Sequence, residues 1–186
     1  MNADGRVDYA MHISGGNLQT TKTTMDAIGV FHATFGVVSL VLGLSILLMP
    51  KGTRRHILLG CSYALSMLVL NATAFFIYNL FGQFGPFHVA AVIGLATLLA
   101  GLIAVLYKRP RKRWIYYHYH FMCWSYVGLV AATVAEITGR VPGWNFALAV
   151  TIPGLIVAGI GALMILEREK ITIEKAIDEN RKNEDY

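Results

Sequence analysis

The chain has 186 residues, of which 55% are apolar and only 15% are charged, and its formal net charge is +5. A soluble domain carries about a quarter charged residues, so this composition excludes a soluble enzyme. The two cysteines lie in no CxxC or zinc-knuckle spacing, which excludes a disulfide framework.

Residues 1–25 are polar and lack the basic start, apolar stretch and cleavage site of a signal peptide, so we expect an extracytoplasmic tail there. The region 26–166 is a transmembrane domain, because its apolar runs of about twenty residues can cross a hydrocarbon core roughly 30 Å thick. Residues 167–186 mix both signs of charge with isoleucines, which predicts a cytoplasmic helical tail. The predicted spans are residues 27–49, 56–80, 87–107, 114–137 and 145–166.

The predicted fold class is all-α, an antiparallel four-helix transmembrane bundle with a fifth transmembrane helix. A short turn joins the second and third spans, which makes them antiparallel neighbours. Small residues in the fifth span, from Ala158 to Ala162, allow close packing against the bundle or against a second copy of the chain. The sequence leaves open which of these two neighbours the fifth helix has.

Positive charge predicts the orientation in a cytoplasmic membrane. Of the 16 Lys and Arg residues, all but Arg6, Lys22 and Arg140 fall on one side of the predicted bundle. Cytoplasmic loops carry such an excess, so the N-terminus is expected outside and the C-terminus inside. These loops explain the net charge without a nucleic-acid partner, and attraction to anionic lipid follows as a secondary effect.

Histidines are the main candidates for function, because ionisable residues are costly inside a membrane. The first three spans contain no Asp, Glu, Lys or Arg, but each contains a histidine. His32 and His88 are expected near the outer surface, and His56, His118 and His120 near the inner one. The histidines therefore form an outer and an inner layer.

Each layer has imidazoles on diagonally opposed helices of the predicted bundle. Two facing imidazoles are what bis-histidine ligation of a b-type haem requires. Pairing His32 with His88 and His56 with His118 gives two haem sites that differ by roughly 20 Å in depth. The leading hypothesis is therefore a di-haem transmembrane electron carrier that exchanges electrons with a quinol or a redox partner protein.

Two glycines support this hypothesis. Gly36 lies one helical turn from His32, and Gly60 lies one turn from His56. A glycine in this position lets a broad ring lie against the helix backbone. Glycines at this spacing also occur simply for close helix packing, so that interpretation stays open.

Helical phase separates the two histidines of the fourth span. His118 and Glu136 share one stripe, whereas His120 faces away from it by about 160°. We therefore favour His118 as the inner ligand and keep His120 as the alternative. Glu136 and Arg140 are four residues apart, which predicts an ion pair. In a functional role, Arg140 would neutralise a haem propionate or quinol head group. The inner candidates for the same role are Arg54, Arg55 and Arg113.

The same residues permit a metal-dependent membrane enzyme. His32, His88 and Glu136 form a two-histidine, one-carboxylate set of the kind that holds catalytic zinc or non-haem iron. The inner layer offers further donors, namely His56, His118 or His120, Cys61 and Cys123. A third possibility is a non-catalytic scaffold whose histidines lie at the membrane interface.

Three strings carry a family resemblance. They are His32-x-x-x-Gly36, Arg55-His56-x-x-x-Gly60-x-x-Tyr63, and HYHFMCWSYVGL from His118 with Glu136 and Arg140 behind it. Together they resemble the bacterial membrane family called domain of unknown function 2306, over about 110 residues. This resemblance implies a topology and a histidine pattern but no activity. The diagonal pairing is also similar in layout to ascorbate-type transmembrane b cytochromes, although this chain has five spans where six are expected.

Overall fold

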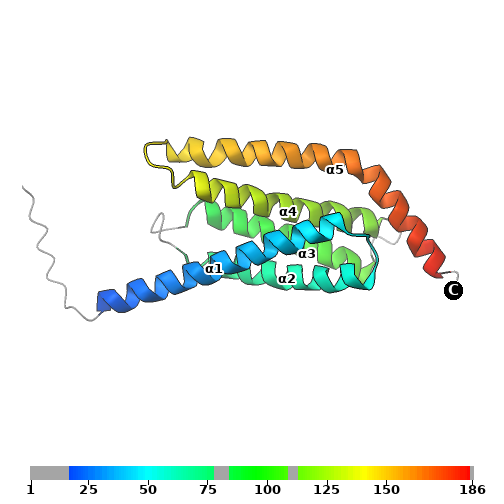
Figure 1. The fold of residues 1–186 in the computed structure, drawn as a ribbon, viewed down its shortest axis with the longest axis horizontal. Helices are drawn as coiled ribbons and strands as arrows, with labels where there is room; N and C mark the ends of the chain where they lie inside the picture. Colours follow the sequence, from blue (N-terminus) through cyan, green and yellow to red (C-terminus); the bar gives the residue numbers. More distant parts are fainter. Residues whose placement is uncertain (1–16, 78–83, 109–112, 185–186) are drawn as a thin grey trace, which may run out of the picture.

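A computed structural model describes residues 17–77, 84–108 and 113–184 of the protein (Figure 1). Side chains are described for residues 27–77, 84–108, 113–169 and 171. These ranges are helical throughout apart from short turns, and no strand occurs in them. Each helix contains a segment long and apolar enough to cross a membrane. The all-α membrane fold predicted from the sequence is therefore confirmed. The helices are α1 (Asn17–Leu48), α2 (Arg54–Ala74), α3 (Pro86–Tyr107), α4 (Trp114–Thr138) and α5 (Phe146–Glu184).

Local sequence explains where α2 and α3 begin. The Thr53 hydroxyl accepts the backbone N–H of His56 at 3.1 Å and so caps α2. Gly52, in the turn before it, has a φ of 78°, a conformation that glycine adopts without strain. Pro86 starts α3, where its missing N–H costs no helical hydrogen bond.

Two helix boundaries differ from the hydropathy prediction. α1 begins at Asn17, inside the segment expected as a tail, because an apolar run marks only the part of a helix inside the membrane. α2 ends at Ala74, whereas the predicted span ran to residue 80. The backbone N–H groups of residues 75–77 bond to carbonyls three residues back, and this tighter turn ends the helix. Residues 78–80 lie outside the described ranges.

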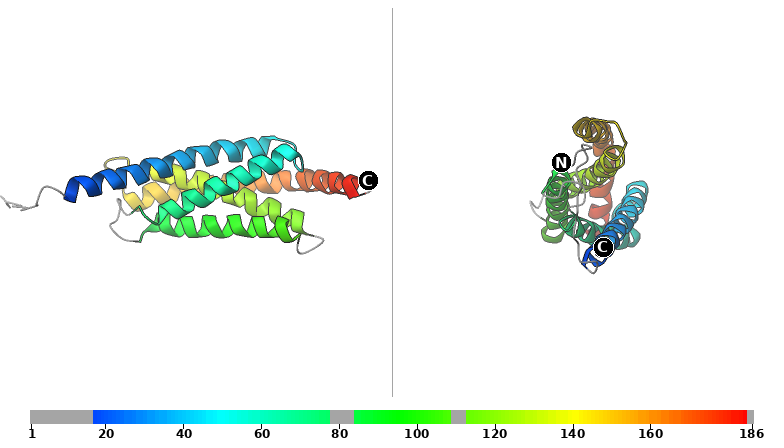
Figure 2. Two further views of the ribbon diagram at one scale, coloured as in Figure 1. Left: turned by 90° about the horizontal axis from the view of Figure 1, so that it is seen from below. Right: turned by 90° about the vertical axis from the view of Figure 1, so that its left-hand side faces the viewer.

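The first four helices form a closed ring. α1 packs against α2, α2 against α3, α3 against α4, and α4 against α1. In the end-on view of Figure 2, α1 and α3 lie on opposite sides of the ring, as do α2 and α4. α5 lies outside this ring and packs along α4. The diagonal relationships expected for the histidines are thus present in the fold.

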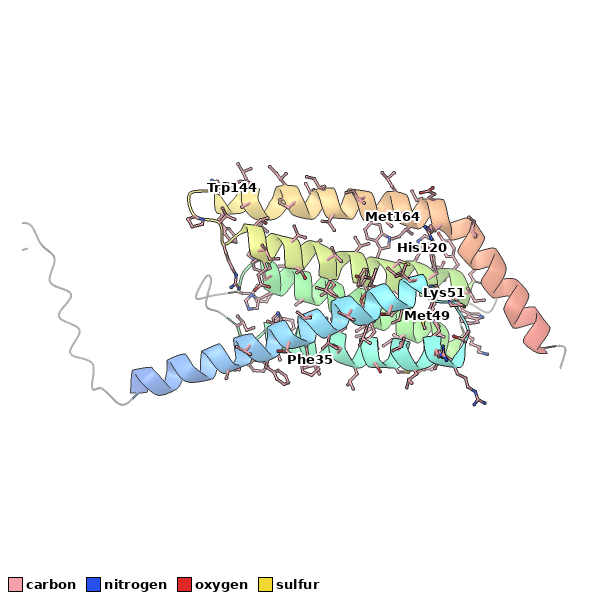
Figure 3. The ribbon with its side chains drawn as sticks, viewed as in Figure 1. Phe35, Met49, Lys51, His120, Trp144 and Met164 are labelled. Atoms are coloured by element: carbon pink, nitrogen blue, oxygen red, sulfur yellow. The ribbon has the colours of Figure 1, made fainter. Side chains whose placement is uncertain are left out.

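One end of the ring carries the α1–α2 and α3–α4 connections, and we call it the basic end. Figure 3 shows Met49 and Lys51 there. The opposite end, which we call the far end, holds the start of α3 and the connection from α4 to α5. The basic residues of the first end whose side chains are described are Lys51, Arg54, Arg55, Lys108, Arg113 and Arg168.

The centre of the bundle combines apolar packing with hydroxyl contacts between helices. Ser39 and Ser66 are both buried, and their Oγ atoms lie 2.8 Å apart. The Tyr63 hydroxyl lies 3.1 Å from Ser125 Oγ, and the Tyr126 hydroxyl donates to the Leu40 carbonyl at 3.1 Å. Such bonds satisfy polar groups that water cannot reach and join helices without a hydrophobic driving force. The buried apolar side chains around them are Tyr63, Ala64, Met67, Leu70, Leu98 and Leu129.

The Lys51 side chain caps the C-terminal end of α1. Its ammonium donates to the carbonyls of Ile46, Leu47 and Met49 at 2.6, 2.9 and 2.9 Å. A positive charge at this place also interacts favourably with the negative end of the helix dipole. Burial lowers the pKa of Lys51 from its ordinary value, and the nearby Cys123 thiol opposes this shift more weakly.

This lowered pKa gives a pH-dependent prediction. The folded chain should release the Lys51 proton at a lower pH than the unfolded chain does. Between the two pKa values the unfolded chain binds more protons, so rising pH favours the folded state in that alkaline window. Acylation of the purified protein across an alkaline series, read from the Lys51 peptide by mass spectrometry, should give a lower midpoint than in denatured protein. An equal or higher midpoint in the folded protein would contradict the prediction.

Candidate functional site

At the basic end, His118 points from α4 toward α3. Its Nδ1 lies 2.9 Å from the backbone oxygen of Gly101. A carbonyl oxygen only accepts, so Nδ1–H is the donor and the neutral ring keeps its lone pair on Nε2. Histidines that bind metals commonly hold their second ring nitrogen in this way. The free lone pair of a neutral His118 is therefore on Nε2.

His56 lies in the first turn of α2, the helix diagonally opposite α4. His56 and His118 are near enough to interact electrostatically. His56 Nδ1 is buried and has no hydrogen-bond partner among the described residues. A buried polar atom without a partner is costly, and a bound group that used this ring would remove that cost.

The surroundings of His56 include a charge and open space. The charge of Lys51 reaches both His56 and Cys123. A Cβ atom built on Gly60, one turn from His56, would meet no atom within 4 Å. The described side chains thus leave the α2 backbone uncovered at Gly60. Arg55, expected beside an inner propionate, lines an open notch on the α1–α2 connection.

His120 lies at the contact between α4 and α5, where Figure 3 labels it. Its Nε2 is 3.5 Å from Glu169 Oε2 on α5. The rings of Tyr116 and Tyr119 lie 4.3 and 5.4 Å from its own ring. Its contacts are therefore with α5 and with its own helix, whereas His118 faces the ring interior.

At the far end, His32 has a defined donor contact. Its Nδ1 lies 2.9 Å from Thr73 Oγ1, and that hydroxyl also lies 2.9 Å from the carbonyls of Val69 and Leu70. Because the hydroxyl proton goes to a carbonyl, Thr73 accepts from His32 Nδ1–H, and the lone pair of the neutral ring is on Nε2. Glu136 of α4 interacts electrostatically with His32. His32 therefore presents the same nitrogen as His118 does.

His88 has the opposite arrangement. Its Nδ1 accepts the backbone N–H of Gly85 at 3.1 Å, so the side chain caps the start of α3. The ring is 4% exposed and stacks on Phe84 with centroids 4.9 Å apart. With the Nδ1 lone pair used, a neutral ring carries its proton on Nε2. This capping role was not predicted, although His88 at the third position of a helix after Gly85 is a signal for it.

The remaining predicted residues at the far end are Gly36, Glu136 and Arg140. Glu136 and Arg140 form the ion pair predicted from their spacing of four residues. A Cβ on Gly36 would lie 3.7 Å from a Leu70 methyl carbon, which is ordinary contact.

A metal-dependent enzyme would need several donor side chains close together. Within the described ranges, no three His, Cys, Asp or Glu side chains lie close enough together to hold a metal ion. The expected outer set of His32, His88 and Glu136 is not assembled as such a group. Of the two cysteines, Cys61 is exposed and Cys123 is buried.

Comparison with known proteins identifies the family. The family described as "Predicted membrane protein (DUF2306)" matches residues 29–166, which include both histidine layers. No curated protein and no solved structure matches the chain. The similarity in layout to ascorbate-type cytochromes finds no support in these comparisons. The match covers most of the chain and confirms the resemblance seen in the histidine and glycine strings, so this protein belongs to the DUF2306 family of predicted membrane proteins.

Proposed function

We propose that this protein is a transmembrane electron carrier that binds a b-type haem at each end of its helical ring. His56 and His118 are the ligands at the basic end, and His32 and His88 are the ligands at the far end. The observation that carries the proposal is the basic-end pair, in which imidazoles from diagonal helices interact electrostatically. One of them is anchored through Nδ1–H, and the other has a buried nitrogen without a partner.

The residues of the basic end have separate roles in this proposal. A haem supplies reversible one-electron transfer at its iron, with a potential set by ligands and nearby charge. His118 binds through Nε2 while the Gly101 carbonyl fixes the ring orientation. Gly60 leaves room for a flat ring beside α2. Lys51 brings a positive charge within reach of His56, which favours electron acceptance at this end.

The far end requires one rearrangement. His32 already presents Nε2, but His88 must give up the Gly85 N–H before its ring takes the ligand tautomer. The exposed Arg140 guanidinium, with Glu136, is placed at the far end for a propionate or a quinol head group. Haem binding at the far end is therefore expected to be weaker than at the basic end.

The proposal also places the protein in its membrane. The basic end faces the cytoplasm and the N-terminus lies outside the cytoplasmic membrane, because the described cations concentrate at one end. Lipid covers the exposed aliphatic side chains of the helices. Electrons are exchanged with a quinol or a redox partner protein, and α5 offers the outward surface for a second copy.

The test is a spectrum of the purified full-length protein produced with an adequate haem supply. We expect a Soret band and a sharp reduced α band, with haem at both layers. His32→Ala should remove the far-end haem and leave the basic-end haem. Colourless protein with stoichiometric zinc or iron would support the metal enzyme instead. Colourless protein without metal would support the scaffold.

A glycine substitution tests the space beside α2. Gly60→Leu should preserve the fold, because no atom lies within 4 Å of the new Cβ, and helix propensity rises by about 1 kcal/mol. The leucine would occupy the space assigned to the haem ring, so haem content at the basic end should fall to near zero. Gly128→Leu is the matched control, since its Cβ also meets nothing within 4 Å. Equal haem content in both variants, measured with circular dichroism to verify folding, would contradict the assignment.

A further inference from the structure

An open notch lies at the basic end, where the chain passes from α1 to α2. Its volume is about 480 Å³, and its lining is mostly apolar. The lining residues are Met49, Pro50, Thr53, Arg54 and Arg55. The notch therefore combines an apolar floor with two guanidinium groups.

On α2, Arg54 lies on the opposite side from His56, and Arg55 lies between these two positions. Arg54 precedes His56 by two residues, which separates them by about 160° around α2, and Arg55 is about 100° away. Since His56 interacts with His118 across the ring, Arg54 is directed to the outer wall. Both arginines are exposed, and neither forms an ion pair with a residue that the structure describes.

Lys51, the third cation of the α1–α2 connection, already has hydrogen-bond partners within the chain. The Lys51 ammonium makes three hydrogen bonds to carbonyls at the end of α1. The two arginines are thus the charges left to bind an anion at the notch. An arginine pair suits a phosphate, because guanidinium groups form paired, charge-assisted hydrogen bonds to its oxygens.

The position of the notch indicates a lipid as the source of that phosphate. It lies between the membrane-spanning segments Ala27–Leu48 and Arg54–Ala74, at the level where a span ends. Leu48, Ile57 and Leu58 adjoin the lining residues within two or three positions in the sequence and are 78%, 59% and 68% exposed. A phospholipid matches this pattern, with an anionic head beside the arginines and acyl chains along α1 and α2.

We propose that the notch between α1 and α2 is a specific binding site for an anionic phospholipid. Arg54 and Arg55 hold the phosphate, and Met49 and Pro50 contact the glycerol and acyl region. This site is separate from the histidine pairs and does not depend on haem. It differs from general attraction of basic loops to the membrane, because it assigns the lipid to two particular side chains.

The test measures lipid bound to the full-length protein by native mass spectrometry, after exchange into detergent with phosphatidylglycerol or phosphatidylcholine. We expect retention of phosphatidylglycerol by the native chain and at least about tenfold weaker retention by Arg54→Gln with Arg55→Gln, because charge-assisted bonds are lost. Arg113→Gln with Arg168→Gln is the matched control, since it removes the same charge from exposed residues at the same end. The control should retain phosphatidylglycerol within about twofold of the native level.

Several outcomes would overturn the proposal. An equal loss in the control variant would show diffuse attraction, and unchanged retention in the notch variant would exclude the two arginines. Displacement of the lipid by millimolar inorganic phosphate would assign the notch to a free anion. Should the double glutamine variant not fold, the single variants Arg54→Gln and Arg55→Gln take its place, and native retention of phosphatidylglycerol in both would exclude the site. Because bound lipid is weighed directly, the result is independent of haem content.

Discussion

His118→Ala is expected to abolish haem binding at the basic end, whereas His120→Ala should leave it in place. The reason is the direction of the two rings. His118 enters the helical ring and interacts with His56, while His120 lies against Glu169 of α5. A six-coordinate haem that loses an axial ligand loses both affinity and its sharp reduced spectrum. The measurement is haem content and the reduced-minus-oxidised spectrum of each purified variant.

A structural role of His118 must be separated from ligation, because the alanine also removes the hydrogen bond to Gly101. Added imidazole can replace a missing ligand but not a missing interhelical bond. We therefore expect imidazole to restore the spectrum of His118→Ala in part. Basic-end haem retained at the native level in His118→Ala without imidazole would exclude His118 as the ligand, and its loss in His120→Ala alone would assign the ligand to His120.

Gly43→Ala is expected to destabilise the bundle by about 1–3 kcal/mol through overpacking. A Cβ at this position would lie 2.2 Å from Cδ2 of Tyr126 and 3.2 Å from Cε2 of Tyr63. Neither ring moves freely, because Tyr126 donates to Leu40 and Tyr63 is bonded to Ser125. The gain in helix propensity, about 1 kcal/mol, offsets only part of this overpacking cost.

Gly128→Ala provides the control for this substitution. It makes the same chemical change in the interior of a membrane helix, but its Cβ would meet no atom within 4 Å. We expect its thermal unfolding in mild detergent, followed by circular dichroism, to be unchanged or slightly raised in midpoint. A Gly43→Ala midpoint that matched this control would refute the close packing of the two tyrosines over α1.

The sequence was sufficient to predict the spans and their arrangement. Apolar runs of this length are readable because a membrane helix must satisfy every backbone hydrogen bond within itself. The polar residues of α4, which share one stripe at a period of 3.6 residues, also predicted which side of this helix faces inward. His118 contacts α3, Ser125 contacts Tyr63 of α2, and Glu136 interacts with His32 of α1.

The hydrogen-bond partners of individual side chains were harder to predict, because they depend on how each helix is rotated about its axis. In a bilayer the outer face of a helix is as apolar as the inner one, so hydrophobic periodicity does not fix the rotation of a helix about its axis. The pairing of Ser39 with Ser66 depends on that rotation in two helices at once. The capping role of His88 depends on the backbone turn at Gly85, and an apolar pattern contains no information about it.

The peripheral position of α5 has a consequence for biogenesis. Within the described ranges, α5 packs against α4 and against no other helix. Every contact of the ring, and every predicted histidine pair, is therefore supplied by helices that are synthesised before α5. Helices that enter the bilayer in order of synthesis would complete the ring first. The last helix then docks on a finished surface and removes the Glu169-facing side of α4 from contact with lipid.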